Sequence, residues 1–255
     1  MSEHVVTETA GGVLTLRFNR PDKKNALLSA MYADAAAALT AAAADPSTRV
    51  VVITGTADSF TAGNDLKDFL ENPPQDANAP VFQFMRALAT FPKPAIAAVN
   101  GMAIGIGVTL LLHCDLVYAV PAAKFQLPFV NIAIVPEFAS SLLLPRLIGP
   151  ARAAELLLLG EAFTAARALE LGLINGVVAS EDLLPTALQK AKALASKAPA
   201  AVRQAKALLR APAAEIAERI ALENKGVAER LTTAEFKEAA TAFFEKRAPD
   251  FSKFS

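Results

Sequence analysis

The first half of the chain alternates strand-like and helix-like patterns of hydrophobic positions. Strands are predicted over residues 5–9, 13–18, 49–55 and 115–120, and helices over residues 29–44 and 81–90. Ser29 is the expected N-cap of the alanine-rich helix. The run at 49–55 is β-branched with few polar residues, which is typical of a strand covered on both faces. Alternating strands and helices predict an α/β architecture.

An uncharged stretch over residues 95–114 is long enough, at about 20 residues, to cross a bilayer. Asn100 and the glycines that follow it interrupt the stretch, and Asp115 comes immediately after it. We interpret the stretch as a buried strand, a glycine turn and a buried helix. No membrane partner is expected.

The C-terminal part of the chain has almost purely helical patterns. Helices are predicted over residues 151–159 and 164–171, and amphipathic ones begin near residues 181, 199, 213 and 233. Their apolar stripes need partners, either the α/β core or a neighbouring subunit. We expect residues 1–195 to form the α/β core and residues 196–255 a helical C-terminal region.

Composition excludes several classes of function. The 255 residues are 53% hydrophobic, and 25 Lys and Arg balance 25 Asp and Glu, so no basic surface for nucleic acid is expected. One cysteine, Cys114, and two histidines cannot form a disulfide or a Cys/His metal site. No secretory signal is evident at residues 1–5. We predict a cytoplasmic protein with no metal.

Side chains that usually do chemistry are scarce. His113 lies in an apolar segment, so a hydrogen-bonded core histidine is favoured over a catalytic base. Ser140 and Ser141 have no evident activating partner. The glycine-rich turns at residues 62–65 and 101–107 instead offer backbone N–H groups, and together could form an oxyanion hole; Asp65 could open a helix.

An ordered set of short segments resembles the signatures of the crotonase superfamily, the enoyl-CoA hydratase/isomerase group. The segments are residues 19–21 (Asn-Arg-Pro), 25–27 (Asn-Ala-Leu), 59–66 (Ser-Phe-Thr-Ala-Gly-Asn-Asp-Leu), 93–94 (Lys-Pro), 100–107 (Asn-Gly-Met-Ala-Ile-Gly-Ile-Gly), 114–115 (Cys-Asp), 165–178 and 245–251. The resemblance covers essentially the whole chain. It implies a crotonase-like ββα superhelix with a helical C-terminal trimerisation region, assembled as a homotrimer or hexamer.

The same resemblance implies an acyl-CoA thioester substrate. It implies no separate cofactor, because coenzyme A is part of the substrate. Its carbonyl oxygen would be held by the N–H groups of Asn64 and Ile106, although hydratases usually carry glycine at the second position. The implied coenzyme A contacts are Lys23, Lys24, Ala62, Asn64, Asp65, Leu66 and Lys246. The implied acyl pocket comprises Phe82, Met85, Thr109 and Phe129.

The acidic residues indicate which reaction is possible. Thr109 and Phe129 occupy the positions of the two glutamates that hydratases use. A single acid, Glu137, appears in a segment that resembles the Δ3,Δ2-enoyl-CoA isomerase branch, where that residue is the catalytic base. Its apolar neighbours should desolvate it and raise its pKa. Alternatively, Glu137 caps a helix that begins near Ala139.

Two other functions stay open at this point. One is enoyl-CoA hydration or another reaction of the crotonase superfamily. The other is a non-catalytic acyl-CoA or RNA binder that would use basic residues of the C-terminal helices, namely Lys190, Lys192, Lys197, Lys206 and Arg210. The sequence also leaves open whether the loop at residues 71–80 closes over a substrate.

Overall fold

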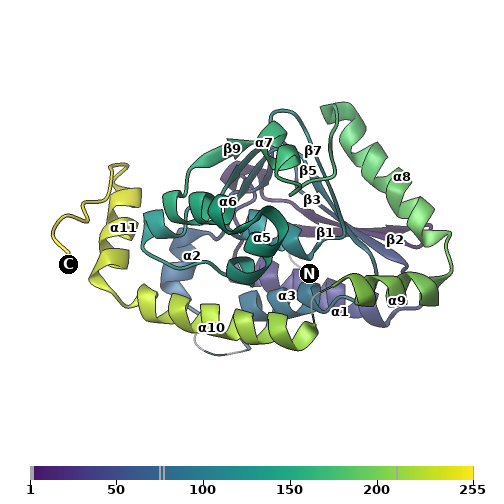
Figure 1. Ribbon diagram of the computed structural model, residues 1–255, viewed down its shortest axis with the longest axis horizontal. Helices are drawn as coiled ribbons and strands as arrows, with labels where there is room; N and C mark the ends of the chain where they lie inside the picture. Colours follow the sequence, from purple (N-terminus) through teal and green to yellow (C-terminus); the bar gives the residue numbers. More distant parts are fainter. Residues whose placement is uncertain (1–2, 75, 77, 211, 255) are drawn as a thin grey trace.

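A six-stranded sheet forms the centre of the computed structural model, which describes residues 3–74, 76, 78–210 and 212–254 (Figure 1). In spatial order its strands are β1 (Val5–Ala10), β2 (Val13–Phe18), β3 (Val50–Thr54), β5 (Ala95–Val99), β7 (Leu116–Ala119) and β10 (Gly176–Val177). β1 and β2, both predicted as strands, form an antiparallel hairpin, and the later pairs are parallel. Every residue of β3 and β5 is buried, which explains their uninterrupted apolar runs.

A second, four-stranded sheet was not predicted. It consists of β4 (Ser59–Thr61), β6 (Met102–Ile104), β8 (Lys124–Gln126) and β9 (Ala162–Thr164). Strands of three residues are too short for a recognisable alternation of side chains. β3, β5 and β7 of the first sheet are each followed along the chain by a strand of the second sheet. This repetition confirms the crotonase-like ββα superhelix.

The uncharged stretch was predicted as one strand, a turn and one helix, and that prediction was incomplete. It holds β5, then β6, a short helix α4 (Ile106–Thr109) and the 3-10 turn η2 (Leu110–His113). Gly101 lets the chain pass from one sheet to the other, since a Cβ there would lie 1.8 Å from the carbonyl oxygen of Asp58. Across the described residues, no helix is long and apolar enough to span a membrane.

The helices cover the sheets in the positions that the patterns indicated. They are α1 (Ser29–Ala44), α2 (Leu66–Glu71), α3 (Pro80–Ala89), α5 (Ser140–Ile148), α6 (Pro150–Ala154), α7 (Ala165–Glu170), α8 (Leu183–Ala195), α9 (Pro199–Leu209), α10 (Ala213–Leu231) and α11 (Ala234–Phe244). Shorter turns are η1 (Pro21–Lys23), η3 (Val130–Ile132), η5 (Ser180–Asp182) and a π-helical turn, η4 (Glu155–Leu159). α1 packs against α3, and α8 packs on the first sheet (Figure 1).

One expected helix cap is wrong. Ser29 is the first residue of α1 rather than its N-cap, and Leu28 takes the cap position without a side-chain bond. The N–H of Ser29 instead donates to Oδ2 of Asp68, a residue of α2, at 2.6 Å. A carboxylate from another helix therefore neutralises this helix end, and no local pattern could indicate it.

The C-terminal helices contribute to the core. Lys206 on α9 is buried and donates to Asp115 Oδ2 at 2.7 Å and to the carbonyl of Lys93 at 2.6 Å. Arg210 also pairs with Asp115, at 3.2 Å. These two cations are therefore engaged inside the protein, which removes them from the basic surface considered for RNA. The division at residue 195 and the trimer remain predictions.

Candidate active site

Two strand-to-helix turns lie next to each other at one edge of the second sheet. β4 and β6 are parallel neighbours, so their carboxyl ends meet at the same edge. β4 leads into the turn of Gly63 and Asn64, and β6 leads into that of Gly105 and Ile106. A Cβ at Gly63 would lie only 2.9 Å from the carbonyl oxygen of Ile104, so the turns are in direct contact. Glycine at 63 is needed also for its φ of +88°.

Each turn presents one backbone N–H without an acceptor among the described residues. Ile106 is the first residue of α4, so its N–H precedes the helical bonding pattern. Around Asn64, the N–H of Gly63 donates to Thr61 Oγ1 and that of Asp65 to the carbonyl of Leu27, while the N–H of Asn64 itself stays unpaired. Two unpaired N–H groups on adjoining turns are the donors that an oxyanion hole requires.

Asn25 holds the first of these turns in place. It is fully buried, with a left-handed φ of 55°. Its side-chain amide donates to the carbonyls of Thr56 and Ser59, at 3.0 and 2.6 Å, and its own carbonyl accepts from Thr61 Oγ1 at 2.7 Å. Asn25, in the Asn-Ala-Leu segment, therefore holds residues 56–61, which lead into the first donor turn. The sequence alone does not indicate this role.

Glu137 is the buried acid of this region. It is 4% exposed and lies in the segment between η3 and α5. Its Oε1 has no hydrogen-bond partner among the described residues. Burial, and secondarily the negative charge of Glu223, raise the pKa of Glu137 to about 8. A carboxyl with that pKa can both accept and return a proton near neutral pH.

The alternative role of Glu137 as a helix cap is wrong. The backbone N–H groups of Ala139 and Ser141, at the start of α5, donate to the carboxylate of Glu223 at 2.5 and 2.9 Å. Ser141 Oγ donates to the same carboxylate at 2.5 Å. Glu137 offers α5 only its backbone carbonyl, which accepts from the N–H of Ser140. Its side-chain Oε1 has no partner among the described residues.

Glu223 was missed in the sequence, although a signal was present. It belongs to the buried stripe of α10, together with Ile216, Ile220 and Val227. An acid at a position where the helical period calls for an apolar residue indicates a buried partner. The pattern does not indicate which partner, because α5 begins more than 80 residues earlier.

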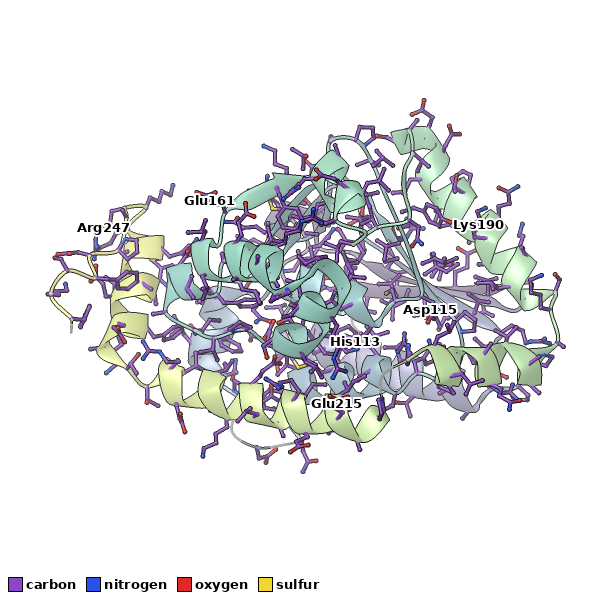
Figure 2. All side chains as sticks on the ribbon, in the orientation of Figure 1. His113, Asp115, Glu161, Lys190, Glu215 and Arg247 are labelled. Carbon is purple, nitrogen blue, oxygen red and sulfur yellow. The ribbon has the colours of Figure 1, made fainter. Side chains whose placement is uncertain are left out.

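His113 is a core side chain, as expected. Its ring stacks on that of Phe138 at a centroid distance of 4.0 Å, and Nε2–H donates to the carbonyl of Phe138 at 2.8 Å. Burial lowers the pKa of His113 to about 3, so the ring is neutral and cannot serve as a cation. Figure 2 places it in the interior near α5, whereas Lys190 lies on the outer face of α8.

Comparison with known proteins agrees with this geometry. Residues 8–253 match the family model described as "Enoyl-CoA hydratase/isomerase". The chain belongs to the enoyl-CoA hydratase/isomerase family. This confirms the resemblance to the crotonase superfamily and makes the protein an enzyme of the acyl-CoA-acting kind.

The relatives of this enoyl-CoA hydratase/isomerase family member include proteins named as isomerases and proteins named as hydratases. It is 36% identical to 1,2-epoxyphenylacetyl-CoA isomerase of Escherichia coli, over 99% of both chains, and 39% identical to 2,3-dehydroadipyl-CoA hydratase of the same organism, over 98% and 99%. It is 38% identical to human enoyl-CoA delta isomerase 2, over 77% of this chain but 52% of that protein.

The fold is shared with solved members of the family. An enoyl-CoA hydratase/isomerase from Pseudoalteromonas atlantica superposes with a TM-score of 0.94 at 42% identity, covering 98% of this chain and all of the other. The sheets and the C-terminal helices described above are therefore the architecture of the family rather than an addition to it.

Tyr32, on α1, is a further residue of this family member's site that the sequence did not indicate. Its hydroxyl donates to the side-chain Oδ1 of Asn64. Burial, then the charges of Glu137 and Asp68, raise the pKa of Tyr32 well above its usual value, so the hydroxyl stays protonated. Tyr32 thus contacts Asn64, one of the two residues with an unpaired N–H, and is close enough to Glu137 for the charge of that carboxyl to raise its pKa. A tyrosine on the buried face of an alanine-rich helix was the available signal.

Only some of the residues expected to contact coenzyme A lie around the first turn. Lys23 and Lys24 are exposed, and the carbonyl of Lys24 accepts from the N–H of Ala62 at 3.0 Å. Asp65 opens α2, as expected, but its carboxylate is taken by that cap and by Arg20 at 2.6 Å. Lys246 is exposed just beyond α11, at the C-terminal end of the molecule (Figure 1).

The expected acyl-pocket residues do not share one cavity. A cleft of about 420 Å³ beside Asn64 is lined by Tyr32 and by most of the loop at 71–80, of which residues 75 and 77 lie outside the described residues. Phe82 instead lines a separate groove of about 340 Å³ between α3 and α10. Met85, Thr109 and Phe129 are buried, and the Phe129 ring lies 4.0 Å from a Cβ placed on Gly105.

No group of three or more His, Cys, Asp or Glu side chains that could hold a metal ion occurs among the described residues. The groups that the structure places in the candidate site are two backbone donors, one buried carboxyl and a protonated tyrosine. These groups can bind a carbonyl oxygen, stabilise negative charge that develops on it, and move a proton.

Proposed function

We propose that the protein is an enoyl-CoA isomerase, which moves the double bond of a 3-enoyl-CoA to give the 2-enoyl-CoA. The observation that carries this proposal is the state of Glu137, a buried carboxyl with an unpartnered oxygen and a pKa of about 8. Its charge acts on Tyr32, which donates to the side chain of Asn64. A buried acid with an unpartnered oxygen and a raised pKa has the properties of a proton shuttle.

The chemistry needs only the groups described. The N–H groups of Asn64 and Ile106 would donate to the thioester oxygen and stabilise the negative charge of the dienolate; removing one such donor typically costs about 3 to 4 kcal/mol of barrier. The ionised carboxylate of Glu137 would remove the proton from the α-carbon. The protonated carboxyl would then return it to the γ-carbon, which moves the double bond into conjugation with the thioester.

Hydration of a 2-enoyl-CoA is the second candidate, supported by the similarity to 2,3-dehydroadipyl-CoA hydratase. Positioning and deprotonating a water there relies on two carboxylates, and Thr109 and Phe129 stand where the hydratase pair would be. Both are buried, and neither can transfer the proton as a carboxylate does. The isomerase proposal is therefore preferred.

The remaining parts of the proposal concern the setting of the reaction. Coenzyme A would enter as part of the substrate, with no metal or redox cofactor, in a cytoplasmic homotrimer or hexamer. The exposed leucines Leu208 and Leu209, at 81% and 87%, support a subunit contact through the end of α9. Sedimentation at several protein concentrations measures the assembly directly.

The test compares the isomerisation of a 3-enoyl-CoA by the wild type, Glu137→Gln and the control Glu161→Gln. Glu161 is exposed (Figure 2). Glu137→Gln should reduce kcat by about 10²- to 10⁴-fold and leave thioester binding intact, while the control keeps full activity. Full activity in Glu137→Gln, or hydration of a 2-enoyl-CoA faster than isomerisation by the wild type, would overturn the proposal.

The pH dependence gives an independent check. A base with a pKa of about 8 is ionised only above that pH, so kcat/KM should rise with pH and reach half its maximum near pH 8. The dependence of kcat/KM on pH is measured on the wild type between about pH 6 and about pH 10, a range centred on that pKa. A profile that is flat or falls through this range contradicts the assignment of Glu137 as the base.

A further inference from the structure

The residues after Glu137 adopt a backbone conformation that needs support. Phe138 and Ala139 have φ values of 60° and 57°, so two consecutive residues with side chains occupy the left-handed region. Such residues are strained and persist only where their surroundings hold them. This turn sets the direction in which the chain leaves Glu137 and therefore where its carboxyl lies.

Two side chains from distant elements hold the turn. His113 donates to the carbonyl of Phe138 at 2.8 Å from η2. Glu223 accepts from the N–H of Ala139 at 2.5 Å from α10, and from the N–H and Oγ of Ser141 at 2.9 and 2.5 Å. His113 is neutral, so Glu223 is the member of this clamp that can carry a charge.

Glu223 and Glu137 are two buried carboxyls whose surroundings differ. Burial raises the pKa of Glu223 above its usual value, and three donors and the positive charge of Arg219 act against that rise. Glu137 has an unpartnered oxygen, and the charge of Glu223 adds to burial in raising its pKa. Donors stabilise the ionised form, so Glu223 ionises more readily than Glu137, whose Oε1 has no donor among the described residues.

We propose that Glu223 is a positioning residue of the active site, which holds the strained turn that directs Glu137 and places a fixed negative charge beside it. This role rests on the proposed function of Glu137 as the proton shuttle. Among the described residues, the other ionisable groups around these two acids are Tyr32 on α1 and His113 on η2, both neutral, and Arg219 on α10, whose positive charge acts on Glu223. Glu223 is the charge that acts directly on Glu137.

The experiment separates charge from reach with two variants. Glu223→Gln keeps the length of the side chain but removes its charge, and Glu223→Asp keeps the charge but shortens the side chain. Glu218→Gln, at an exposed position of the same helix, is the matched control. The protonated carboxyl of Glu137 is followed by its infrared band during a pH titration, and the band is assigned by its loss in Glu137→Gln.

Removal of the charge in Glu223→Gln should move the midpoint of the Glu137 titration, and with it the rise of kcat/KM, to lower pH. Shortening in Glu223→Asp should lower kcat by about 10- to 100-fold with a smaller change in KM, because the turn no longer holds Glu137 in place. The control should retain the midpoint and the kcat of the wild type. An unchanged midpoint in Glu223→Gln overturns the charge role, and an unchanged kcat in Glu223→Asp overturns the holding role.

The infrared titration does not depend on which reaction the enzyme performs. If Glu137→Gln retained isomerase activity, the proposed function would fail, yet the midpoint in Glu223→Gln would still decide whether Glu223 acts on Glu137. Thermal unfolding of each variant identifies a folding defect. If Glu223→Asp does not fold, the midpoint in Glu223→Gln remains decisive for the proposal.

Discussion

Replacement of Glu137 by glutamine should make the protein more stable at high pH, because the buried carboxyl is costly to ionise. The pKa of Glu137 is about 8 in the folded protein and 4.5 in the absence of burial. Since the folded pKa is the higher one, the folded state binds more protons between these values, and the wild type loses stability as pH rises through them. The difference of about 3.5 units corresponds to at most about 5 kcal/mol, of which about 4 kcal/mol falls between pH 5 and 9.

Glutamine keeps the shape of the side chain and does not titrate, so the variant lacks this loss. The assay is guanidinium unfolding followed by circular dichroism at pH 5, 7 and 9, at one protein concentration. The free energy of unfolding of Glu137→Gln relative to the wild type should grow by up to about 4 kcal/mol from pH 5 to 9. The control Glu8→Gln, at an exposed strand position, should show no such trend. A difference between variant and wild type that stays constant within about 1 kcal/mol across this range would refute the burial argument.

Three further substitutions test the surroundings of the site. Gly63→Ala should lower kcat by about 10- to 100-fold, because its Cβ would lie 2.9 Å from a backbone oxygen of the other donor turn. In the control Gly11→Ala, also left-handed, the Cβ would have no atom within 4 Å, so the variant should lose stability but keep its kcat. Tyr32→Phe removes one hydrogen bond to the oxyanion-donor turn and should lower kcat/KM by about 3- to 10-fold. The comparison is made at a pH high enough that kcat/KM no longer rises. Lys206→Ala breaks a buried ion pair and should reduce the free energy of unfolding by about 2 to 4 kcal/mol, against less than about 0.5 kcal/mol for the exposed Lys190→Ala; equal effects in chemical denaturation would contradict the pairing.

The buried ion pair of Lys206 also has a pH signature. Burial lowers its pKa to about 8, so the folded protein releases this proton more readily than the unfolded chain does. The unfolded chain therefore binds more protons between about pH 8 and 10.5, and the net contribution of Lys206 to stability becomes more favourable as pH rises through that range. The substitution is measured below about pH 8, where the ammonium is charged.

Local patterns determined much of this molecule. The buried run at 49–55, the hairpin and the order of helices follow from the periodicity of apolar residues, which is a property of neighbours along the chain. The two donor turns also follow from local composition, since glycine at 63 and 105 permits conformations that other residues avoid. Glu137 stood out because its segment resembles the isomerase branch, and its apolar neighbours predicted that it is desolvated.

Other features depended on contacts between residues far apart in the sequence. The second sheet escaped prediction because its strands are three residues long and are stabilised by each other rather than by their own pattern. The caps of α1 and α5 are carboxylates from other helices, Asp68 and Glu223, so sequence proximity suggested the wrong groups. Phe82 has the apolar character expected of a pocket residue, yet α3 turns it toward α10.

The sequence by itself determined which groups are present: backbone N–H groups on two glycine turns, one acid in an apolar segment, and few histidines and cysteines. Only the tertiary structure decided which of these groups share an environment. The pKa of Glu137 depends on what surrounds its carboxyl, and the role of Glu223 depends on a helix end more than 80 residues away in the chain. Desolvation and hydrogen bonding act through space, so they become defined only when the chain has folded.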